Sequence, residues 1–405
     1  APCMSVCPLK VDVRAMIEKV QRGDFTAAYR LYRNQVVFPR IVSTICDQPC
    51  KSVCVRNPFD EAVDLRFIEQ ACVELTKDRE PIRFNVPRKK HSIAVIGGGL
   101  SGMACALKLA GRNYEVTVYE RQDLPGGMLK ELLPREIYLS EFENEFKDVA
   151  YQLITGREIL CLDEIQADAV YVATGAGGKV FGLRDEMDLN SLGTRKQGVF
   201  LGGSVIGAPP IEAIEHGVRV SHSIEKYLKV GRMDGIPETY QERPIEKKYY
   251  SLPIGAEAFP RHSQRENGGD RAVIDQAVGG QAVIDRAAAE AKRCLKCDCN
   301  LCVDRCDLML KFKTNPKRIV HDVQVTMRPL EKFSKRVASR LINSCNQCGL
   351  CQSICPEHVD MEDCLRQARY FLHRDGAMPE AYHEFWLRDM DFANSQPACA
   401  FVSPE

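Results

Sequence analysis

Apolar and polar positions in the middle of the chain predict strands that alternate with helices. Residues 93–96 form an apolar run typical of a buried strand, and residues 103–110 continue at helical spacing. Further strands are expected at 115–119, 169–173 and 198–201, and a helix from 209 to about 228. Because strands and helices alternate, this region is expected to be an α/β domain built on a Rossmann-type sheet.

Both flanks of this region have a different pattern. Residues 11–35 place apolar side chains at helical spacing around a Gly23-Asp24 break, which predicts two short helices. A tandem repeat at 272–277 and 282–287 is expected to be structural, its second copy continuing into a helix that leads to Cys294. We therefore expect domains at 1–85, 90–230 and 291–405, with a linker at 231–290.

The turn after the first strand carries a nucleotide-binding pattern. Gly97, Gly99 and Gly102 match G-x-G-x-x-G between a strand and a helix, the context in which this motif is specific. The first glycine permits the turn, the second lets a pyrophosphate approach, and the third lets helix and strand pack. Glu120 ends the second strand, where an acidic side chain binds a ribose hydroxyl. The fingerprint predicts a dinucleotide site for either FAD or NAD.

Most of the 19 cysteines fall into three groups. These are Cys3, Cys7, Cys46, Cys50 and Cys54; Cys294, Cys297, Cys299, Cys302 and Cys306; and Cys345, Cys348, Cys351 and Cys355. The others, Cys72, Cys105, Cys161, Cys364 and Cys399, are expected to be small buried hydrophobic residues. Such grouping indicates metal binding, since a disulfide scaffold is typical of short secreted chains richer in cysteine.

The third group has the spacing of a bacterial ferredoxin. In Cys345-x2-Cys348-x2-Cys351-x3-Cys355-Pro, the first three thiolates bind one [4Fe–4S] cluster and the fourth binds another. A structural zinc site is disfavoured because zinc usually takes its ligands as separated pairs.

The second group is expected to be the partner of this run in a ferredoxin-like dicluster domain. By the two-cluster rule, Cys306 completes the cluster of the first three cysteines of the third group, and Cys355 completes the other cluster. Five cysteines share four positions here. The sequence leaves open which of Cys294, Cys297 and Cys299 is not a ligand.

The first group predicts at least one N-terminal [4Fe–4S] cluster. Cys7-Pro8 repeats the end of the ferredoxin run. Cys46, Cys50 and Cys54 follow at a four-residue spacing that would place them along one face of a helix. The chain starts at Ala1 and not at Met, so the ligands that a second N-terminal cluster would lack are expected upstream of it.

Charge and hydropathy exclude several functions. With 55 basic and 55 acidic residues, the chain does not suit nucleic-acid binding or polybasic membrane binding. The longest uncharged stretch, residues 92–107, is too short for membrane insertion. Abundant thiols without an export signal predict a cytoplasmic protein. No Ser-His-Asp or paired-carboxylate pattern supports hydrolysis, and no catalytic residue is assigned. The aromatic tail, 378–401, is expected to pack as a cap or to dock a partner.

With these motifs, the chain resembles the FAD and iron–sulfur oxidoreductases typified by the glutamate synthase small subunit, whose relatives include the N-terminal region of dihydropyrimidine dehydrogenase. The matching features lie within residues 1–228: the first cysteine group, the glycine-rich turn with Glu120, and the sequences 125–127, 173–175 and 198–203. The resemblance implies FAD bound by Gly97, Gly99, Leu100, Ser101, Gly102, Glu120, Arg121, Gly127, Met128, Ala173, Thr174, Gly175, Gly203, Ser204, Pro210 and Ile211. It also implies that Glu69, beside Gln70, serves as a cluster ligand.

The sequence departs from that family in two respects that bear on its activity. Family members insert an NAD(P)-binding domain between the strands that here correspond to 169–173 and 198–201, but residues 176–197 are too few to form it. Ser204 stands where the family often has an aspartate on the ribityl chain of FAD, and its hydroxyl leaves room for one hydrogen bond.

These observations predict an electron-transfer subunit of a larger oxidoreductase, which relays electrons between FAD, its clusters and partner redox subunits or ferredoxin. A self-sufficient NAD(P)H oxidoreductase of the glutamate synthase small-subunit type is the alternative. A cluster-stabilised assembly scaffold is an alternative of another class. Donor, acceptor and direction of electron flow are left open.

Overall fold

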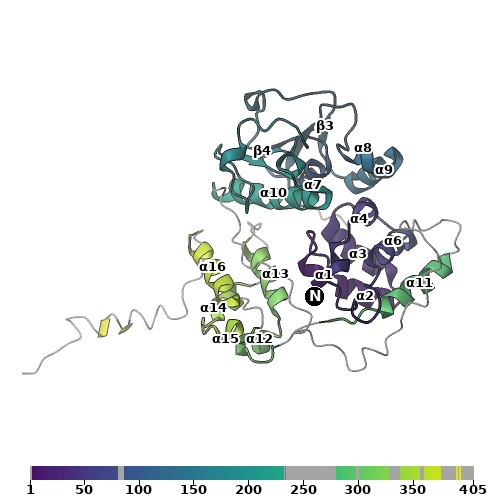
Figure 1. The fold of residues 1–405 in the computed structure, drawn as a ribbon. Helices are drawn as coiled ribbons and strands as arrows, with labels where there is room; N and C mark the ends of the chain where they lie inside the picture. Colours follow the sequence, from purple (N-terminus) through teal and green to yellow (C-terminus); the bar gives the residue numbers. More distant parts are fainter. Residues whose placement is uncertain are drawn as a thin grey trace, which may run out of the picture.

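The computed structural model describes residues 2–80, 86–231, 233, 280–297, 301–327, 338–355, 360–374, 389–390 and 392–393. Figure 1 shows a sheet with its helices, a helical group at the N-terminus and a second helical group in the C-terminal part. The expected α/β multidomain architecture is confirmed. Of the aromatic tail, only two helical pairs of residues are described, and the rest of that expectation lies outside the described residues.

A five-stranded parallel sheet in the order β3-β2-β1-β4-β5 forms the middle of the molecule. Its strands are β1 (Ser92–Ile96), β2 (Glu115–Tyr119), β3 (Gln152–Ile154), β4 (Ala169–Val172) and β5 (Val199–Leu201). Ile96 pairs with Tyr119 on one side and Val172 on the other, so the carboxyl ends of these strands are level. The strand order reverses at β1, and parallel sheets bind ligands at the carboxyl ends next to such a reversal.

Two helices, α7 (Leu100–Ala110) and α10 (Pro210–Val230), pack closely against each other beside this sheet (Figure 1). Glycines permit the close approach. A Cβ at Gly102 would lie 1.9 Å from the carbonyl oxygen of Gly97, and one at Gly217 would lie 2.2 Å from that of Ser101. The contact therefore fixes the start of α7, which directly follows the glycine-rich turn.

The N-terminal group contains short helices around an apolar core. They are α1 (Pro2–Ser5), α2 (Val13–Gln21), α3 (Phe25–Val36), α4 (Pro39–Ile45), α5 (Pro49–Ser52) and α6 (Leu65–Leu75). α2, α3 and α6 each begin at an aspartate, Asp12, Asp24 or Asp64, whose side chain accepts a hydrogen bond from a backbone N–H of the first turn. The two helices expected within 11–35 are present as α2 and α3.

The single helix suggested for Cys46, Cys50 and Cys54 is wrong. α4 ends before Cys46, whose backbone is extended, and Gln48 is left-handed with a φ of 58°. Pro49 disfavours a helical residue before it and starts α5 instead. The three cysteines are therefore presented from a bent segment.

The N-terminal helices join the α/β domain through α9 (Arg135–Phe146). Arg33 forms an ion pair with Glu145 at 2.6 Å, and the backbone N–H of Arg40 donates to Glu141 at 2.8 Å. The rings of Phe38 and Phe142 meet edge to face, with centroids 5.1 Å apart. One continuous apolar core includes residues of both domains.

Helix α11 (Gly280–Lys292) packs on α2 and α6, although more than two hundred residues separate it from them in the chain (Figure 1). It contains the second copy of the tandem repeat, while the first copy lies outside the described residues. The Arg286 guanidinium lies 4.4 Å from the ring centroid of Phe67. The end of the expected linker, together with residues 291–297, thus belongs structurally to the N-terminal helices and not to the C-terminal domain.

The C-terminal group has an apolar core of its own. Its helices are α12 (Asp307–Phe312), α13 (Pro316–Met327), α14 (Ser339–Ser344), α15 (Leu350–Ser353) and α16 (Met361–Arg374). Polar contacts join it to the other groups: Lys317 pairs with Asp12 at 3.0 Å, and the Lys226 ammonium lies 5.1 Å from the ring centroid of Phe371.

The segment between β4 and β5 is fully described and contains no α-helix or strand. Residues 173–198 contain one short 3₁₀ helix, η2 (Arg184–Glu186), and one isolated β-bridge, from Gly193 to Phe200. No second nucleotide-binding domain is inserted in this segment, as the sequence predicted. The remaining short elements are α8 (Leu129–Leu132), η1 (Leu162–Glu164) and η3 (Gly203–Ile206). Within the part of the chain that is described, no helix has the length and apolar character needed to cross a membrane.

We expect Gly217→Ala to lower the thermal unfolding midpoint. The new methyl group would overlap the Ser101 carbonyl, and overpacking costs about 1–3 kcal/mol, more than the ~1 kcal/mol that alanine gains over glycine in a helix. Circular dichroism melting measures the change. Gly280→Ala in α11 is the matched control, because a Cβ there meets nothing within 4 Å. Equal midpoints for Gly217→Ala and the unchanged protein would contradict this account of the α7–α10 contact.

Candidate functional site

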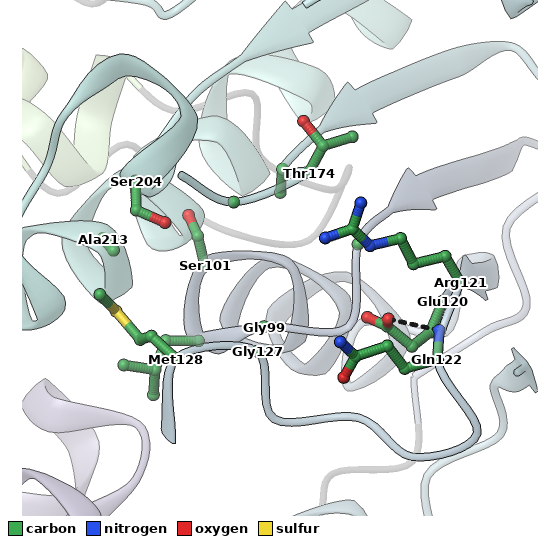
Figure 2. A pocket seen from close by; sticks show the side chains of 14 residues that line it. Gly99, Ser101, Glu120, Arg121, Gln122, Gly127, Met128, Thr174, Ser204 and Ala213 are labelled. Atoms are coloured by element: carbon green, nitrogen blue, oxygen red, sulfur yellow. Dashed lines mark hydrogen bonds between the residues drawn. The ribbon is translucent and has the colours of Figure 1, made fainter. Parts of the chain in front are cut away.

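A cleft opens at the carboxyl ends of β1, β2 and β4, where α7 begins. Its open volume is about 530 Å³. It is lined by Gly97, Gly99, Leu100, Ser101, Glu120, Arg121, Gln122, Gly127, Met128, Ala173, Thr174, Gly175, Ser204 and Ala213 (Figure 2). The cleft thus gathers loops that follow four different strands around the start of one helix.

The glycines of the cleft are required by its geometry. Gly97 has a φ of +115°, and a Cβ there would lie 2.2 Å from the carbonyl oxygen of Ala173. A Cβ on Gly127 would lie 3.2 Å from the Cα of Gly99. The backbone at Gly97 and at the Gly99–Gly127 contact therefore faces the cleft without side chains. The N–H groups at the start of α7 can receive a phosphate.

Glu120 organises the turn at the end of β2. One of its carboxylate oxygens accepts the backbone N–H of Gly98 at 2.7 Å, and the other accepts that of Gln122 at 2.8 Å. The side chain is 8% exposed, and Figure 2 shows it at one end of the cleft. Each oxygen keeps a further lone pair, so the carboxylate can hold the loop and still accept a ribose hydroxyl.

Polar contacts also order the opposite end of the cleft. The hydroxyls of Ser101 and Tyr171 lie 2.6 Å apart. The backbone N–H of Gly203 donates to Nδ1 of His216 at 3.1 Å, so this nitrogen is held as an acceptor. Burial, with a smaller effect from Arg219, lowers the pKa of His216 to about 4.

Most of the flavin residues expected from the sequence line this cleft. Gly102, Gly203, Pro210 and Ile211 do not line it. Gly102 instead lets α7 start close to the Gly97 carbonyl. Gly203 donates a backbone hydrogen bond to His216. The sequence reasoning missed Gln122 and Ala213. The position of Gln122 directly after Glu120 and Arg121 could have indicated it, whereas Ala213 becomes a lining residue only through the packing of α10.

The cleft fits a dinucleotide. It has a side-chain-free cradle at a helix N-terminus and an acidic residue at the end of the second strand. It extends to Thr174 and Ser204 at the ends of β4 and β5, which leaves a longer lined surface than the phosphate cradle alone.

A first set of cysteines surrounds Glu69 in the N-terminal helices. Glu69 lies on α6, and the hydroxyl of Tyr32 donates to it at 3.3 Å. Burial raises the pKa of Glu69 to about 8. Burial raises the pKa of Cys7, and it raises that of Cys46 to about 12; Glu69 adds to both effects. The thiols of Cys7, Cys46 and Cys50 thus lie near the Glu69 carboxyl.

A second set of cysteines lines a pocket whose open volume is about 440 Å³. Cys3, Cys54, Cys294 and Cys297 contribute to its wall together with Cys50. Burial raises the pKa of Cys3 to about 12, and smaller contributions to this rise come from Cys297, Cys294 and Cys54. The structure thus differs from the expectation that Cys294 and Cys297 lie in the C-terminal dicluster run. It places both with the N-terminal cysteines.

A third set lies in the C-terminal helices. Burial raises the pKa of Cys345 and of Cys351, with Cys306 and Cys348 contributing to both. Cys306 is therefore near the first three cysteines of the ferredoxin run, as the two-cluster rule requires. Arg369 on α16 holds this loop by donating to the backbone carbonyls of Ile342, Asn343 and Cys345.

Other cysteines are placed as follows. Cys302 packs at the edge of the C-terminal core, and Cys355 is half-buried, whereas Cys299 lies outside the described residues. Cys72, Cys105 and Cys364 are buried, but Cys161 is exposed, so the expectation of a buried residue is wrong there. Cys399 lies outside the described residues. Among the described residues, no three His, Cys, Asp or Glu side chains are close enough to hold a single metal ion.

Comparison with known domain families matches each part of the chain separately. Residues 1–80 match the dihydropyrimidine dehydrogenase domain II, 4Fe-4S cluster family. Residues 95–132 match an NAD(P)-binding Rossmann-like domain, and residues 293–360 match a 4Fe-4S dicluster domain. The chain thus combines two kinds of iron–sulfur domain with a nucleotide-binding domain. The matches support FAD and [4Fe–4S] clusters as its cofactors.

The curated relatives of this chain are larger proteins. The chain is 30% identical over 227 residues to the NADPH-Fe(3+) oxidoreductase subunit beta of Geobacter sulfurreducens, covering 52% of this chain and 33% of that protein. It is 28% identical over 276 residues to the NADP(+)-dependent formate dehydrogenase subunit beta of Moorella thermoacetica, covering 55% and 39%. It is also 28% identical over 183 residues to the glutamate synthase [NADPH] small chain of Bacillus subtilis, covering 42% and 37%. The chain thus spans little more than a third of each relative.

We expect Glu120→Ala to weaken flavin binding. The change leaves the backbone N–H groups of Gly98 and Gln122 without their acceptor, and each lost hydrogen bond costs about 1–3 kcal/mol. Because these bonds hold the turn in the shape that binds the cofactor, we expect the affinity for flavin to fall by a factor of about 10 or more. Glu120→Gln keeps one acceptor oxygen and should lose less. Flavin retained after anaerobic gel filtration measures the effect. Glu143→Ala, an exposed change on α9, is the control. Equal flavin content in Glu120→Ala and the control would refute this role.

We expect His216 to make stability depend on pH. Its pKa is about 4 in the folded chain and 6.5 when unperturbed, so between these values the unfolded chain binds more protons. The contribution of neutral His216 is complete above pH 6.5 and is lost as the pH falls toward 4. His216→Asn, whose amide oxygen can accept from Gly203 without titrating, should show a smaller fall in melting temperature between pH 7.5 and 5. Parallel pH profiles for the two proteins would contradict this.

Proposed function

We propose that this chain relays electrons between FAD and [4Fe–4S] clusters inside a larger oxidoreductase. The observation that carries the proposal is that one chain joins a dinucleotide cleft to three sets of cysteines, with no inserted nicotinamide domain between β4 and β5. FAD exchanges two electrons with a hydride donor or acceptor and passes them on singly, while each cluster carries one.

The residues of the cleft have defined tasks in this proposal. The N–H groups at the start of α7 bind the pyrophosphate, and Glu120 orients the ribose while holding the Gly98 turn. Pro210 begins α10 near the far end of the cleft, where the positive end of the helix dipole favours electron density on a flavin ring. His216 is neutral at physiological pH and keeps the Gly203 backbone in place.

The contacts between domains support a short route for electrons. α4, which ends at Ile45 directly before Cys46, contacts both α9 and α10 of the α/β domain. The first cysteine set therefore lies at the end of an element that is packed against the dinucleotide domain. Cys50, which lies near Glu69 with the first set, also lines the pocket of the second set. The helices that carry the third set are joined to the N-terminal helices by the ion pair between Lys317 and Asp12.

The relatives favour a partner subunit as the source or destination of the electrons. Two of them are named as beta subunits, of an NADPH-Fe(3+) oxidoreductase and of a formate dehydrogenase. We infer that partner redox subunits or ferredoxin exchange electrons with this chain in the cytoplasm. The chain balances its charges overall, which leaves specific contacts to select the partner.

Anaerobic purification followed by rapid mixing tests this proposal. We expect one FAD per chain, more than about eight irons, and a flavin that stays oxidised for seconds after mixing with NADH or NADPH. Dithionite serves as the positive control for reduction. Rapid bleaching of the flavin by either nucleotide would favour the self-sufficient NAD(P)H oxidoreductase. Fewer than about eight irons would contradict the relay, and electron transfer that survives large shifts in cluster potential would favour the assembly scaffold.

A further inference from the structure

The second cysteine set is built from three distant parts of the chain. Cys3 comes from α1, Cys54 from the segment after α5, and Cys294 and Cys297 from the segment after α11. All four line one cavity, whose other walls are largely apolar side chains such as Val13, Val55 and Leu65. Cys294 and Cys297, spaced as Cys-x2-Cys, thus lie beside Cys3 and Cys54 in space.

A buried ion network fixes the segment that carries this pair. Arg56 donates to the backbone carbonyl of Arg293 at 2.7 Å and forms an ion pair with Asp60 at 2.6 Å. Arg293 in turn donates to the carbonyl of Glu61 at 2.7 Å and pairs with Asp60 at 3.2 Å. Arg56 is 2% exposed and Arg293 is 3% exposed. Arg56 and Asp60 thus hold Arg293, the residue directly before Cys294.

A second arm of this network fixes the end of α11. Glu290 is 4% exposed, pairs with Arg293, and accepts the backbone N–H of Asp64 at 2.7 Å. Gln21 donates to the carbonyl of Ala291 at 2.9 Å. Buried ion pairs add little net stability because desolvation offsets their attraction, but breaking one is strongly destabilising. Their effect here is to hold residues 290–297 in one position against α2 and the start of α6.

Packing divides the cysteine run between two domains. Leu295 and Val55 form a small buried cluster, with Cys297 at its edge. Cys294 packs on the N-terminal core, whereas Cys302 and Cys306 pack on the separate C-terminal core. The run therefore splits between Cys297 and Cys302. This differs from the family match, in which the dicluster domain starts at residue 293.

Cys50 also borders the cavity. A [4Fe–4S] cube takes four ligands from the protein, and the set of Cys7, Cys46 and Glu69 has three without Cys50. Assigning Cys50 to the set with Cys7 and Cys46 leaves four thiols around the cavity.

We propose that Cys3, Cys54, Cys294 and Cys297 together bind a [4Fe–4S] cluster. Four thiolates are the usual ligands of such a cube, and soft sulfur ligands suit its irons. The cluster would then join the first residues of the chain to the segment entering the C-terminal domain. This assignment holds whatever the direction of electron flow. The C-terminal sets are left with Cys299, Cys302, Cys306, Cys345, Cys348, Cys351 and Cys355.

Iron counts on single and double variants of the full chain test the proposal. Cys54→Ala and Cys294→Ala should each remove about four irons per chain and abolish the same EPR signal of the reduced protein. Because both touch one cluster, the double variant should lose no more than either single. Cys345→Ala should remove a different signal, and its loss should add to that of Cys294→Ala. Cys161→Ala, an exposed cysteine outside all three sets, is the control and should lose no iron.

The outcomes separate this proposal from others. A double variant of Cys54 and Cys294 that loses about eight irons would place Cys294 in the dicluster and overturn the proposal. Stoichiometric zinc in place of the four irons would also overturn it. If Cys294→Ala fails to fold, Cys294→Ser answers instead, since a serine oxygen can bind iron and shift the signal. A shift of the signal lost in Cys54→Ala supports the assignment, and a shift of the signal lost in Cys345→Ala refutes it. Flavin reduction by NADPH would overturn the relay but leave this assignment intact.

Discussion

The buried ion network of Arg56, Asp60, Arg293 and Glu290 determines how this chain is organised. It attaches residues 290–297 to the N-terminal helices, although the whole dinucleotide domain lies between them in sequence. Unpaired buried charges are costly, so these four side chains specify one docking position for α11. The position of Cys294 and Cys297 follows from that docking, and so does the point at which the C-terminal helices leave the rest of the molecule.

The dinucleotide cleft depends on close backbone contacts that only glycine permits. Gly102 and Gly217 let α7 approach its own turn and α10, and Gly97 passes beside Ala173 where no side chain would fit. The helix start and the strand ends are thereby held around one cleft. Arg33, Arg40 and Phe38 then join this domain to the N-terminal helices through α9. The cofactor cleft and the first two cysteine sets are therefore parts of one packed structure, whereas the third set belongs to the separate C-terminal core.

Local patterns in the sequence were sufficient for four strands of the sheet, β1, β2, β4 and β5, and for the dinucleotide fingerprint. The strand at 93–96, the three glycines and Glu120 carry periodicity and turn chemistry that act within a few residues. The sequence could not show that Cys294 joins Cys3, because that proximity depends on α11 packing against α2 and on ion pairs formed over long range. Gln48 and Pro49 end the helix expected at Cys46, a local signal that the four-residue cysteine spacing obscured.

The central claim is that electrons pass between flavin and clusters within one chain. Photoreduction of the flavin by a light pulse, followed by rapid-freeze EPR, tests it most directly. The account predicts that cluster signals rise as the reduced flavin is reoxidised, at a rate that does not change with protein concentration. A rate proportional to protein concentration, or clusters that stay oxidised while the flavin remains reduced, would contradict it.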